Sequence, residues 1–249
     1  MWNKPQLMAA VSDLLIVAGA AALLVAALIW AARLPFFPLH EVTVTNELRE
    51  IKRGEVEASL AGRLQGNFFS VDLEGIRRSL EQLSWVRRVE VRRQWPGRIE
   101  VSIEEHRPAA YWGADTGQLV NTYGEVFVAG LGLQPGSAMP VLSGPSGWAP
   151  EMLRQYQTAA EALKPLGVSP RALSVSPRLA LQMQLDDGTV VELGREQTKA
   201  TVSQRMQRFV ENYESMLRLA GQRPGVVDMR YPNGFAMRIA AATDSRGKP

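Results

Sequence analysis

Residues 83–108 read LSWVRRVEVRRQWPGRIEVSIEEHRP, and this stretch decides the fold of the first half of the chain. Apolar and charged residues alternate on both sides of Pro96-Gly97. A period of two is typical of a strand with one buried face, and Pro-Gly is typical of a turn. The segment therefore predicts a hairpin. We expect one face of its first strand to carry Trp85, Val89, Val91 and Trp95, and the buried face of its second to carry Ile99, Val101 and Ile103.

One strand and two helices are predicted before this hairpin. Two valines alternate with polar residues over 41–44, as in a half-buried strand. A short helix follows with an apolar residue at every fourth position: Val56, Leu60 and Leu64. Asp72 suits the N-cap of a second helix, because its carboxylate can accept a backbone N–H of the first turn. The apolar stripe of that helix is Leu73, Ile76, Leu80 and Leu83. This order predicts a small α+β unit with two helices on one face of a three-stranded sheet.

An apolar segment precedes this unit. Leu14 to Ala32 is a run of 19 residues without a charge. At about 1.5 Å per residue its length is close to the roughly 30 Å of a hydrocarbon core. The alternative is a cleaved signal peptide, whose apolar region normally has about 7–15 residues. We predict a retained transmembrane helix over 14–33, with Trp30 as an interfacial anchor, after a short tail over 1–13.

The charges that flank the segment do not determine its orientation. Lys4 and Asp13 precede it, whereas Arg33, Arg49 and Lys52 follow it. The positive-inside rule therefore does not favour a cytoplasmic N-terminus, although large domains translocate largely regardless of charge.

The second half of the chain has the pattern of a β-rich domain with two helices. Short strand pieces are expected at 111–112, 119–120 and 126–128, and 140–145 reads as a loop. Pro150 suits the first turn of a helix. Its apolar stripe is Leu153, Tyr156, Ala160 and Leu163.

A hairpin and a second helix complete this domain. Leu179, Leu181, Met183 and Leu185 alternate with other residues, and Asp187-Gly188 is a strong turn into 190–193. The second helix carries Val202, Met206, Phe209, Val210, Tyr213 and Leu217. Final strands are expected over 226–231 and 235–239, and the tail from Ala240 is expected to be disordered. The strand order cannot be read from this pattern.

Composition and motifs argue against catalysis. The 249 residues have a net charge of +3, which is too mild to indicate nucleic-acid binding, and no cysteine, which excludes disulfides and thiolate chemistry. Asp115-Thr116-Gly117 resembles an aspartic-protease motif, but those enzymes need two copies and a turn is the simpler interpretation. His40 and His106 are the only histidines, and neither lies beside a serine elbow. Asp186-Asp187 is interpreted as a hairpin tip.

The hairpin of the first unit is basic, and two interpretations of its charge stay open. Its arginines are Arg87, Arg88, Arg92, Arg93 and Arg98. They can form a solvated face that protects an edge strand from aggregation. They can also dock an acidic partner or anionic lipid headgroups.

The segment 83–96, followed by Glu105-His106-Arg107-Pro108, resembles the FtsQ/DivIB family of bacterial cell-division proteins. Ser84 stands where that family usually has proline. Three later segments resemble the same family: 193–195, 204–210 and 227–236. The resemblance extends to about Met237. It implies a POTRA domain over 37–106, an FtsQ-type β domain over 107–240 and a tail over 241–249.

The resemblance also implies a function. Such a chain would be a non-enzymatic scaffold without a cofactor, single-pass in the inner membrane at the division septum, with a cytoplasmic N-terminus and a periplasmic bulk. FtsB, in a coiled coil with FtsL, would add a strand to the C-terminal edge, and FtsK would engage the POTRA domain. The implied edge residues are Arg178, Tyr231, Asn233, Gly234, Phe235 and Met237. Weaker candidates in the POTRA domain are Arg88, Val91 and Arg93.

The role of Arg178 and the overall function each have an alternative. Arg178 can form a bidentate bond with a partner carboxylate, or can be an ordinary exposed turn arginine. The whole chain can instead be another POTRA-containing protein of secretion or assembly, or a membrane-anchored envelope hydrolase. A transmembrane β-barrel would favour the former, and a paired acid and base in a cleft would favour the latter.

Overall fold

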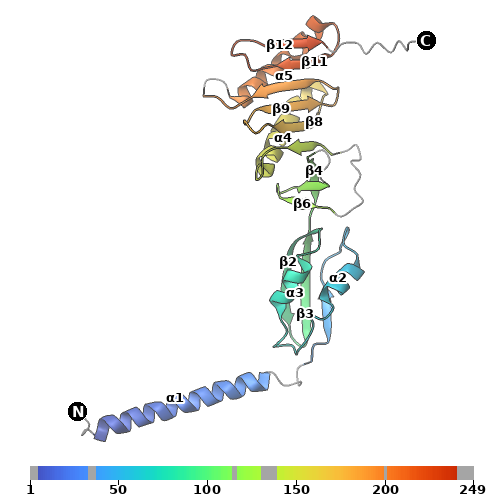
Figure 1. Cartoon of the computed structure of the whole chain (residues 1–249). Helices are drawn as coiled ribbons and strands as arrows, with labels where there is room; N and C mark the ends of the chain where they lie inside the picture. The colour runs from blue at the N-terminus through green and yellow to red at the C-terminus, as the bar shows by residue number, and fades with distance from the viewer. Residues whose placement is uncertain (1–4, 33–37, 114–116, 130–138, 199–200, 240–249) are drawn as a thin grey trace. The chain divides into compact units, whose positions relative to one another are not determined.

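The computed structural model describes residues 5–32, 38–113, 117–129, 139–198 and 201–239 (Figure 1). Internal contacts divide the chain into two compact units, Met1–Glu105 and His106–Pro249. Asp115, Thr116 and the tail from Ala240 lie outside the described residues.

The N-terminal segment forms one long helix, α1, over Pro5–Ala32. Its stretch Ala9–Ala31 has the length and the apolar composition to cross a bilayer, and it is not buried within the protein. Large apolar side chains along it, such as Leu14, Leu23 and Trp30, are exposed. A core helix of a soluble domain would bury such side chains, so α1 fits an apolar solvent better than water.

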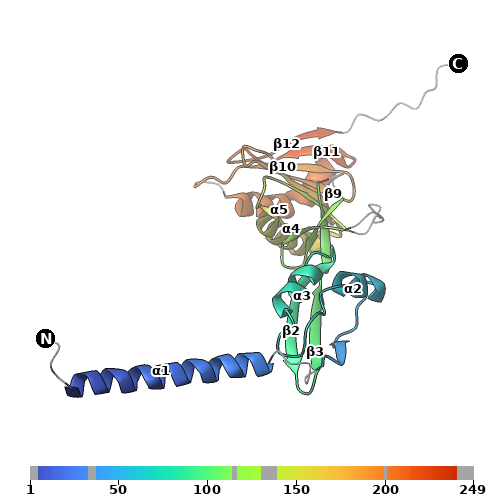
Figure 2. The same cartoon turned by 60° about the horizontal axis from the view of Figure 1, so that its bottom comes forward.

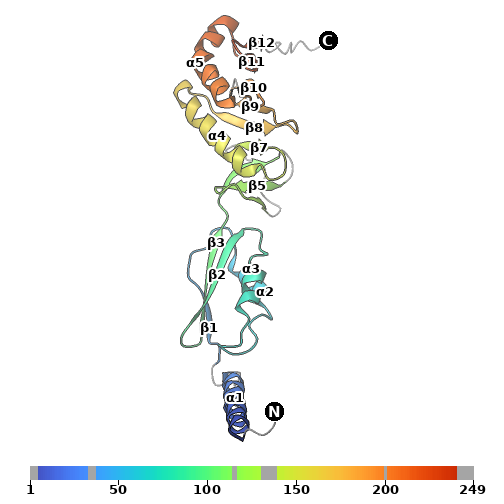
Figure 3. The same ribbon diagram turned by 90° about the vertical axis from the view of Figure 1, so that its left-hand side faces the viewer.

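The rest of the first unit confirms the predicted order of strand, helix, helix, strand and strand. Its elements are β1 (Glu41–Val44), α2 (Arg53–Leu60), α3 (Leu73–Leu80), β2 (Val86–Gln94) and β3 (Arg98–Glu105). The sheet order is β1-β3-β2, with β1 parallel and β2 antiparallel to β3. Both helices cover one face of this sheet (Figure 3). The predicted residues Ile99, Val101 and Ile103 are buried beneath them.

Most local details of the first unit follow the sequence, but Leu83 was wrongly placed on the second helix, because α3 ends at Leu80. Asp72 caps α3 as predicted, since its Oδ1 accepts the backbone N–H of Gly75 at 2.9 Å. Leu64 was wrongly placed on the first helix, because α2 ends at Leu60 and Gly62 turns the chain with a φ of 77°. Trp85 and Trp95 were predicted to lie on the first strand of the hairpin, but β2 spans Val86–Gln94, so Trp85 precedes it and Trp95 follows it. Trp95 is exposed, whereas Val89 on the same predicted face is buried.

The second unit is built on one mixed sheet of nine strands. Its strands are β4 (Pro108–Trp112), β5 (Gln118–Asn121), β6 (Val126–Val128), β7 (Val141–Ser143), β8 (Pro170–Val175), β9 (Leu181–Leu185), β10 (Val190–Gly194), β11 (Pro224–Asp228) and β12 (Ala236–Ile239). Its helices are α4 (Ala149–Leu163), the short 3-10 helix η1 (Lys164–Leu166) and α5 (Val202–Ala220). The strand order is β12-β11-β10-β9-β8-β7-β4-β5-β6.

Two crossovers place both long helices on one face of this sheet. Helix α4 joins the parallel neighbours β7 and β8, and α5 joins the parallel neighbours β10 and β11. Because β9 is antiparallel to both β8 and β10, all four of these strands run in the same direction. Each crossover also moves one strand toward β12. Right-handed connections of this kind put both helices on the same side, where they lie next to each other (Figures 2 and 3).

The structure corrects several expectations for the second unit. Residues 141–143 form the interior strand β7 and not a loop, and β8 was not predicted. Leu179 lies in a turn with a φ of 60° and not in a strand. Strand β11 ends at Asp228, so Tyr231 lies beyond it. The hairpin turn at Asp187-Gly188 and the helix that begins beside Pro150 are confirmed.

A buried tyrosine links α5 to the tip of the β9–β10 hairpin. The hydroxyl of Tyr213 donates to Oδ2 of Asp187 at 2.9 Å, and Oδ1 of Asp187 accepts the backbone N–H of Thr189 at 2.9 Å. Burial, and then the hydrogen bond to Asp187, raise the pKa of Tyr213 to about 12. The phenol thus stays protonated in the folded state above the pKa of about 10 that it has in an unfolded chain.

We expect Tyr213→Phe to lower the free energy of unfolding by about 1–2 kcal/mol at neutral pH, because a hydrogen bond to a carboxylate is lost. In the wild type, the contribution of Tyr213 is complete below pH 10 and is lost as the pH rises toward 12, since the unfolded chain releases this proton first. The variant should lose less stability over that range. Chemical unfolding in detergent at several pH values measures both effects. The exposed Tyr231→Phe serves as the control, and an equal alkaline loss in all three proteins would contradict the assignment.

Candidate functional site

Strand β12 forms one edge of the nine-stranded sheet. Among the described residues it pairs with β11 alone, in an antiparallel register in which Met237 lies opposite Val227. Met237 and the preceding Phe235 are partly buried against the core, whereas Ala236, Arg238 and Ile239 are exposed. The outer side of an edge strand presents backbone N–H and C=O groups that another strand can pair with.

The loop between β11 and β12 is held in place from both sides. Met229 is buried, and its N–H donates to the carbonyl of Glu192 at 2.9 Å. From α5, the guanidinium of Arg208 donates to the carbonyls of Tyr231, at 3.2 Å, and of Pro232. Tyr231 is nevertheless 55% exposed, so an ordered loop displays an aromatic residue to solvent.

Two arginine side chains come close to Gly194 at the end of β10, where the absence of a Cβ leaves room for them. Arg205 is only 1% exposed, and its guanidinium donates to the carbonyls of Leu193 and Arg195. A Cβ on Gly194 would lie 2.8 Å from Cγ of Arg230 and 3.0 Å from Nη1 of Arg205. The φ of Gly194 is 72°, a left-handed conformation that also favours glycine.

Arg230 is fixed over the sheet by two carboxylates. Its Nε and Nη2 donate to Asp228 at 2.8 and 2.6 Å, and Nη2 lies 3.0 Å from a carboxylate oxygen of Glu192. The hydrogen bond from Arg230 holds the pKa of the Asp228 carboxyl below its ordinary value. The same bond raises the pKa of the Arg230 guanidinium, so this ion pair persists throughout the physiological pH range.

A row of polar side chains crosses the face of the sheet that the helices leave open. Neighbouring strands place Ser174, Gln182, Glu192 and Asp228 opposite one another in turn, and Asp228 lies opposite Ala236 of β12. A shallow cavity of about 250 Å³ lies along this row, lined by the β8–β9 turn on one side and by Arg230 on the other. The row therefore leads from the β8–β9 turn to the edge strand.

Arg178 lies in that turn and is exposed. It is at the same end of the sheet as Tyr231, because β9 begins beside the end of β10, and β10 ends beside β11. Strands are about 4.8 Å apart, so roughly 10–15 Å separates the turn from the β11 end. The structure thus brings Arg178 and the Tyr231 loop to one end of the sheet, but does not place them on one edge.

The remaining edge residues have different environments. Asn233 is exposed at the turn that precedes β12, and Gly234 beside it is half-buried. Sequence reasoning named neither Arg205 nor Arg208 as a site residue. A signal existed for Arg205, since it lies within the apolar stripe of its helix next to Val202, Met206 and Phe209. A charge at such a position needs partners inside the fold.

The three candidates of the first unit also differ. Arg88 is exposed on β2, with Glu90 at 3.9 Å, whereas Val91 is partly buried against the core. The guanidinium of Arg93 donates to the carbonyls of Phe68 and Val71 at 2.8 and 2.9 Å. Both arginines are exposed, but Arg93 holds a loop of its own unit, so Arg88 is the stronger candidate for a partner contact.

The described part of the chain contains no cluster of three or more His, Cys, Asp or Glu side chains that could hold a metal ion. His106, the histidine at the start of the second unit, stacks on Phe127 with ring centres 4.2 Å apart and lies 2.9 Å from the amide nitrogen of the buried Asn121. These contacts give it a structural role.

Comparison with known proteins agrees with this architecture. The profile described as "POTRA domain, FtsQ-type" matches residues 37–106, and that described as "Cell division protein FtsQ/DivIB, C-terminal" matches 110–230. The cell division protein FtsQ of Burkholderia pseudomallei (strain K96243) is 37% identical over 240 residues, which cover 96% of this chain and 95% of that protein. The FtsQ of Bordetella pertussis (strain Tohama I) is 34% identical over 271 residues, which cover 100% of this chain and 98% of that protein.

The chain belongs to the FtsQ/DivIB family. It is thus a cell-division protein of a non-enzymatic family whose members act together with other division proteins. Family membership and the apolar helix α1 together indicate a single-pass membrane protein. The C-terminal FtsQ/DivIB profile ends at Arg230, so the loop and the edge strand that follow lie beyond it.

We expect Gly194→Ala to destabilise this FtsQ/DivIB chain more than Gly188→Ala does. Both glycines have a positive φ, but nothing lies within 4 Å of a Cβ built on Gly188. Gly188→Ala should therefore cost about 1 kcal/mol for backbone strain alone, and Gly194→Ala about 2–4 kcal/mol because Arg205 or Arg230 must also move. Chemical unfolding in detergent measures both losses. Equal losses would show that Arg205 and Arg230 do not need a glycine at position 194.

Proposed function

We propose that this chain is a division scaffold that binds FtsB by strand addition to the outer side of β12. The observation that carries the proposal is the outer edge of β12, with which no further described strand pairs, beside an ordered loop that exposes Tyr231. A partner segment paired with β12 would satisfy backbone groups along the edge, while the tyrosine would supply an apolar contact that selects the partner. Phe235 and Met237 hold the strand against the core, and so keep the edge ordered before binding.

Arg178 gives the proposed interaction a second, charged contact. A partner that pairs with β12 can continue past the end of the sheet and follow the polar row toward the β8–β9 turn. There an acidic side chain of FtsB could form a bidentate bond with the exposed guanidinium. Since Arg178 lies two to three strand spacings from the β11 end, the bound segment must be longer than the edge strand alone.

The wider role follows from this contact. FtsB would arrive in a coiled coil with FtsL, and the chain would link that pair to upstream division proteins at the septum. The first unit, with the exposed Arg88, would engage FtsK. In this proposal α1 crosses the inner membrane with its N-terminus in the cytoplasm, and both folded units lie in the periplasm.

The test is a titration of the detergent-solubilised full chain with a peptide from the C-terminal part of the cognate FtsB. Tyr231→Asp places a charge in the apolar contact, and Arg178→Glu opposes the expected carboxylate. Each should weaken binding about tenfold or more, as measured by calorimetry or fluorescence anisotropy.

Arg171→Glu is the matched control. Arg171 is an exposed arginine near the start of β8, at the opposite end of that strand from the turn that carries Arg178, so its reversal should leave the affinity within about twofold. Equal binding by all four proteins would place the FtsB contact elsewhere. Absence of binding by a correctly folded wild type would remove the FtsB-scaffold proposal.

A further inference from the structure

Three large apolar side chains are exposed at one end of the first unit. Leu64 is 38% exposed, Phe69 45% and Trp95 64%, and we call them the proximal patch because they lie at the end where β1 begins. Trp95 is in the turn between β2 and β3, and the N–H of His40, just before β1, donates to the carbonyl of Gly97 in that turn at 2.8 Å. The patch therefore surrounds the point at which the chain enters this unit.

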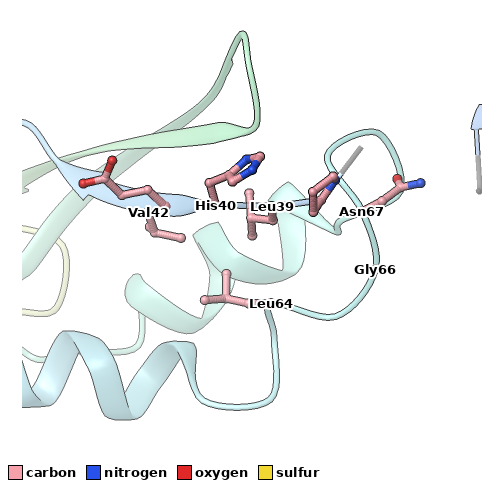
Figure 4. Close-up of a pocket in the computed structure, with 8 residues that line it drawn as sticks. Leu39, His40, Val42, Leu64, Gly66 and Asn67 are labelled. Atoms are coloured by element: carbon pink, nitrogen blue, oxygen red, sulfur yellow. The ribbon is translucent and has the colours of Figure 1, made fainter. Parts of the chain in front are cut away.

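Side-chain contacts hold the three members of the patch at this end of the unit. The ring of Trp95 packs edge-on against Phe68, 5.8 Å away, and Phe68 packs edge-on against Phe69 at 5.1 Å. Leu64 lines a cavity of about 400 Å³ together with Leu39 and His40, and its side chain points toward the segment that carries them (Figure 4).

The loop that carries Phe69 is ordered. The side-chain oxygen of Asn67 accepts the N–H groups of Phe69 and Ser70, at 3.0 and 2.9 Å. Arg93 donates to the carbonyls of Phe68 and Phe69, at 2.8 and 3.2 Å. The exposure of the Phe69 ring is thus fixed by a hydrogen-bonded loop. Exposed apolar groups held in this way are typical of an interaction surface.

Exposed arginines lie near the patch. Arg63, Arg92 and Arg98 are exposed at the same end of the unit. Arg92 has Glu90 at 2.8 Å, and Arg98 has Glu41 at 3.6 Å, but both guanidiniums remain more than half exposed. Aromatic side chains beside arginines are the combination that suits the boundary between lipid headgroups and water.

The covalent chain keeps this surface close to the bilayer. Only seven residue steps separate Ala31, at the end of the membrane-spanning stretch of α1, from Pro38, which lines the cavity beside the patch. A fully extended chain gains at most about 3.3–3.6 Å per residue, so this end of the unit cannot lie more than roughly 25 Å from the end of the span. Headgroup layers add several ångströms to each side of the hydrocarbon core, which shortens the remaining distance.

We propose that the proximal patch is a membrane-docking surface, which inserts Trp95, Phe69 and Leu64 among the headgroups of an anionic phospholipid bilayer. The neighbouring arginines lie beside the lipid phosphates. Docking of this kind holds the first unit against the membrane that α1 spans. It depends on α1 spanning a bilayer, but not on the FtsB contact in the second unit.

The chain contains no cysteine, so one introduced cysteine gives a single labelling site on the full-length protein. Leu64→Cys places a fluorophore in the patch. Gln82→Cys is the matched control, because Gln82 is exposed beyond the C-terminal end of α3, at the opposite end of the unit from Asp72 and the patch. Each labelled chain is reconstituted in phosphatidylethanolamine–phosphatidylglycerol vesicles with lipids that carry a quencher at headgroup depth.

We expect strong quenching of the label at residue 64 and only background quenching at residue 82. Adding Phe69→Ser and Trp95→Ser to the Leu64→Cys chain should reduce quenching to the level at residue 82. Vesicles of phosphatidylcholine alone should reduce it as well, because the arginines lose their anionic partners. Both substituted side chains are exposed, and circular dichroism of the reconstituted protein confirms that the variants stay folded.

Other outcomes overturn the proposal. Background quenching at both labels would place the patch away from the lipid, and would favour a protein partner for it. Equal strong quenching at both labels would indicate adsorption without a preferred end. Unchanged quenching after Phe69→Ser and Trp95→Ser would show that the aromatic side chains do not anchor the unit.

Discussion

The candidate site depends on one buried charge. The guanidinium of Arg205 binds the carbonyls at the end of β10, and so fixes the start of α5 to the strand that precedes it. A buried cation without such acceptors would cost several kcal/mol, so the fold is constrained to keep helix and strand end together. Arg208, one turn further along α5, then reaches the Tyr231 loop. The buried Arg205 thus positions α5, and Arg208 on that helix positions the loop that exposes Tyr231.

The path of the chain explains why β12 is at an edge and why one face of the sheet stays open. The α5 crossover carries the chain from β10 to its parallel neighbour β11, and the right-handed rule puts the helix on the face that α4 already covers. The chain then turns back once to add β12 antiparallel to β11. The helices share one face, so the other face remains open with its polar row. The β11–β12 loop therefore lies beside both the edge strand β12 and the open face of the sheet.

The periodicity of the sequence predicted the elements whose strands pair with near neighbours in the chain. The first unit and the Asp187-Gly188 hairpin were predictable because their strands alternate and pair with near neighbours in sequence. Strand β7 is three residues long, and β7 and β8 pair in parallel across a whole helix, so no local pattern reveals them. The Tyr231 loop was found through family resemblance. Arg205 and Arg230 come from different segments of the chain and both lie close to Gly194, and only the fold reveals this contact.

Strands β2 and β12, one outer strand from each sheet, differ in the side chains that they expose. The exposed residues in the middle of β2 are Arg88, Glu90 and Arg92, and such charges along an edge discourage another strand from pairing with it. The exposed residues of β12 are Ala236, Arg238 and Ile239, of which only one is charged. Desolvating β12 therefore costs less than desolvating β2, since fewer ionised side chains lose water. Of these two edges, side-chain chemistry therefore favours strand addition at β12 over β2.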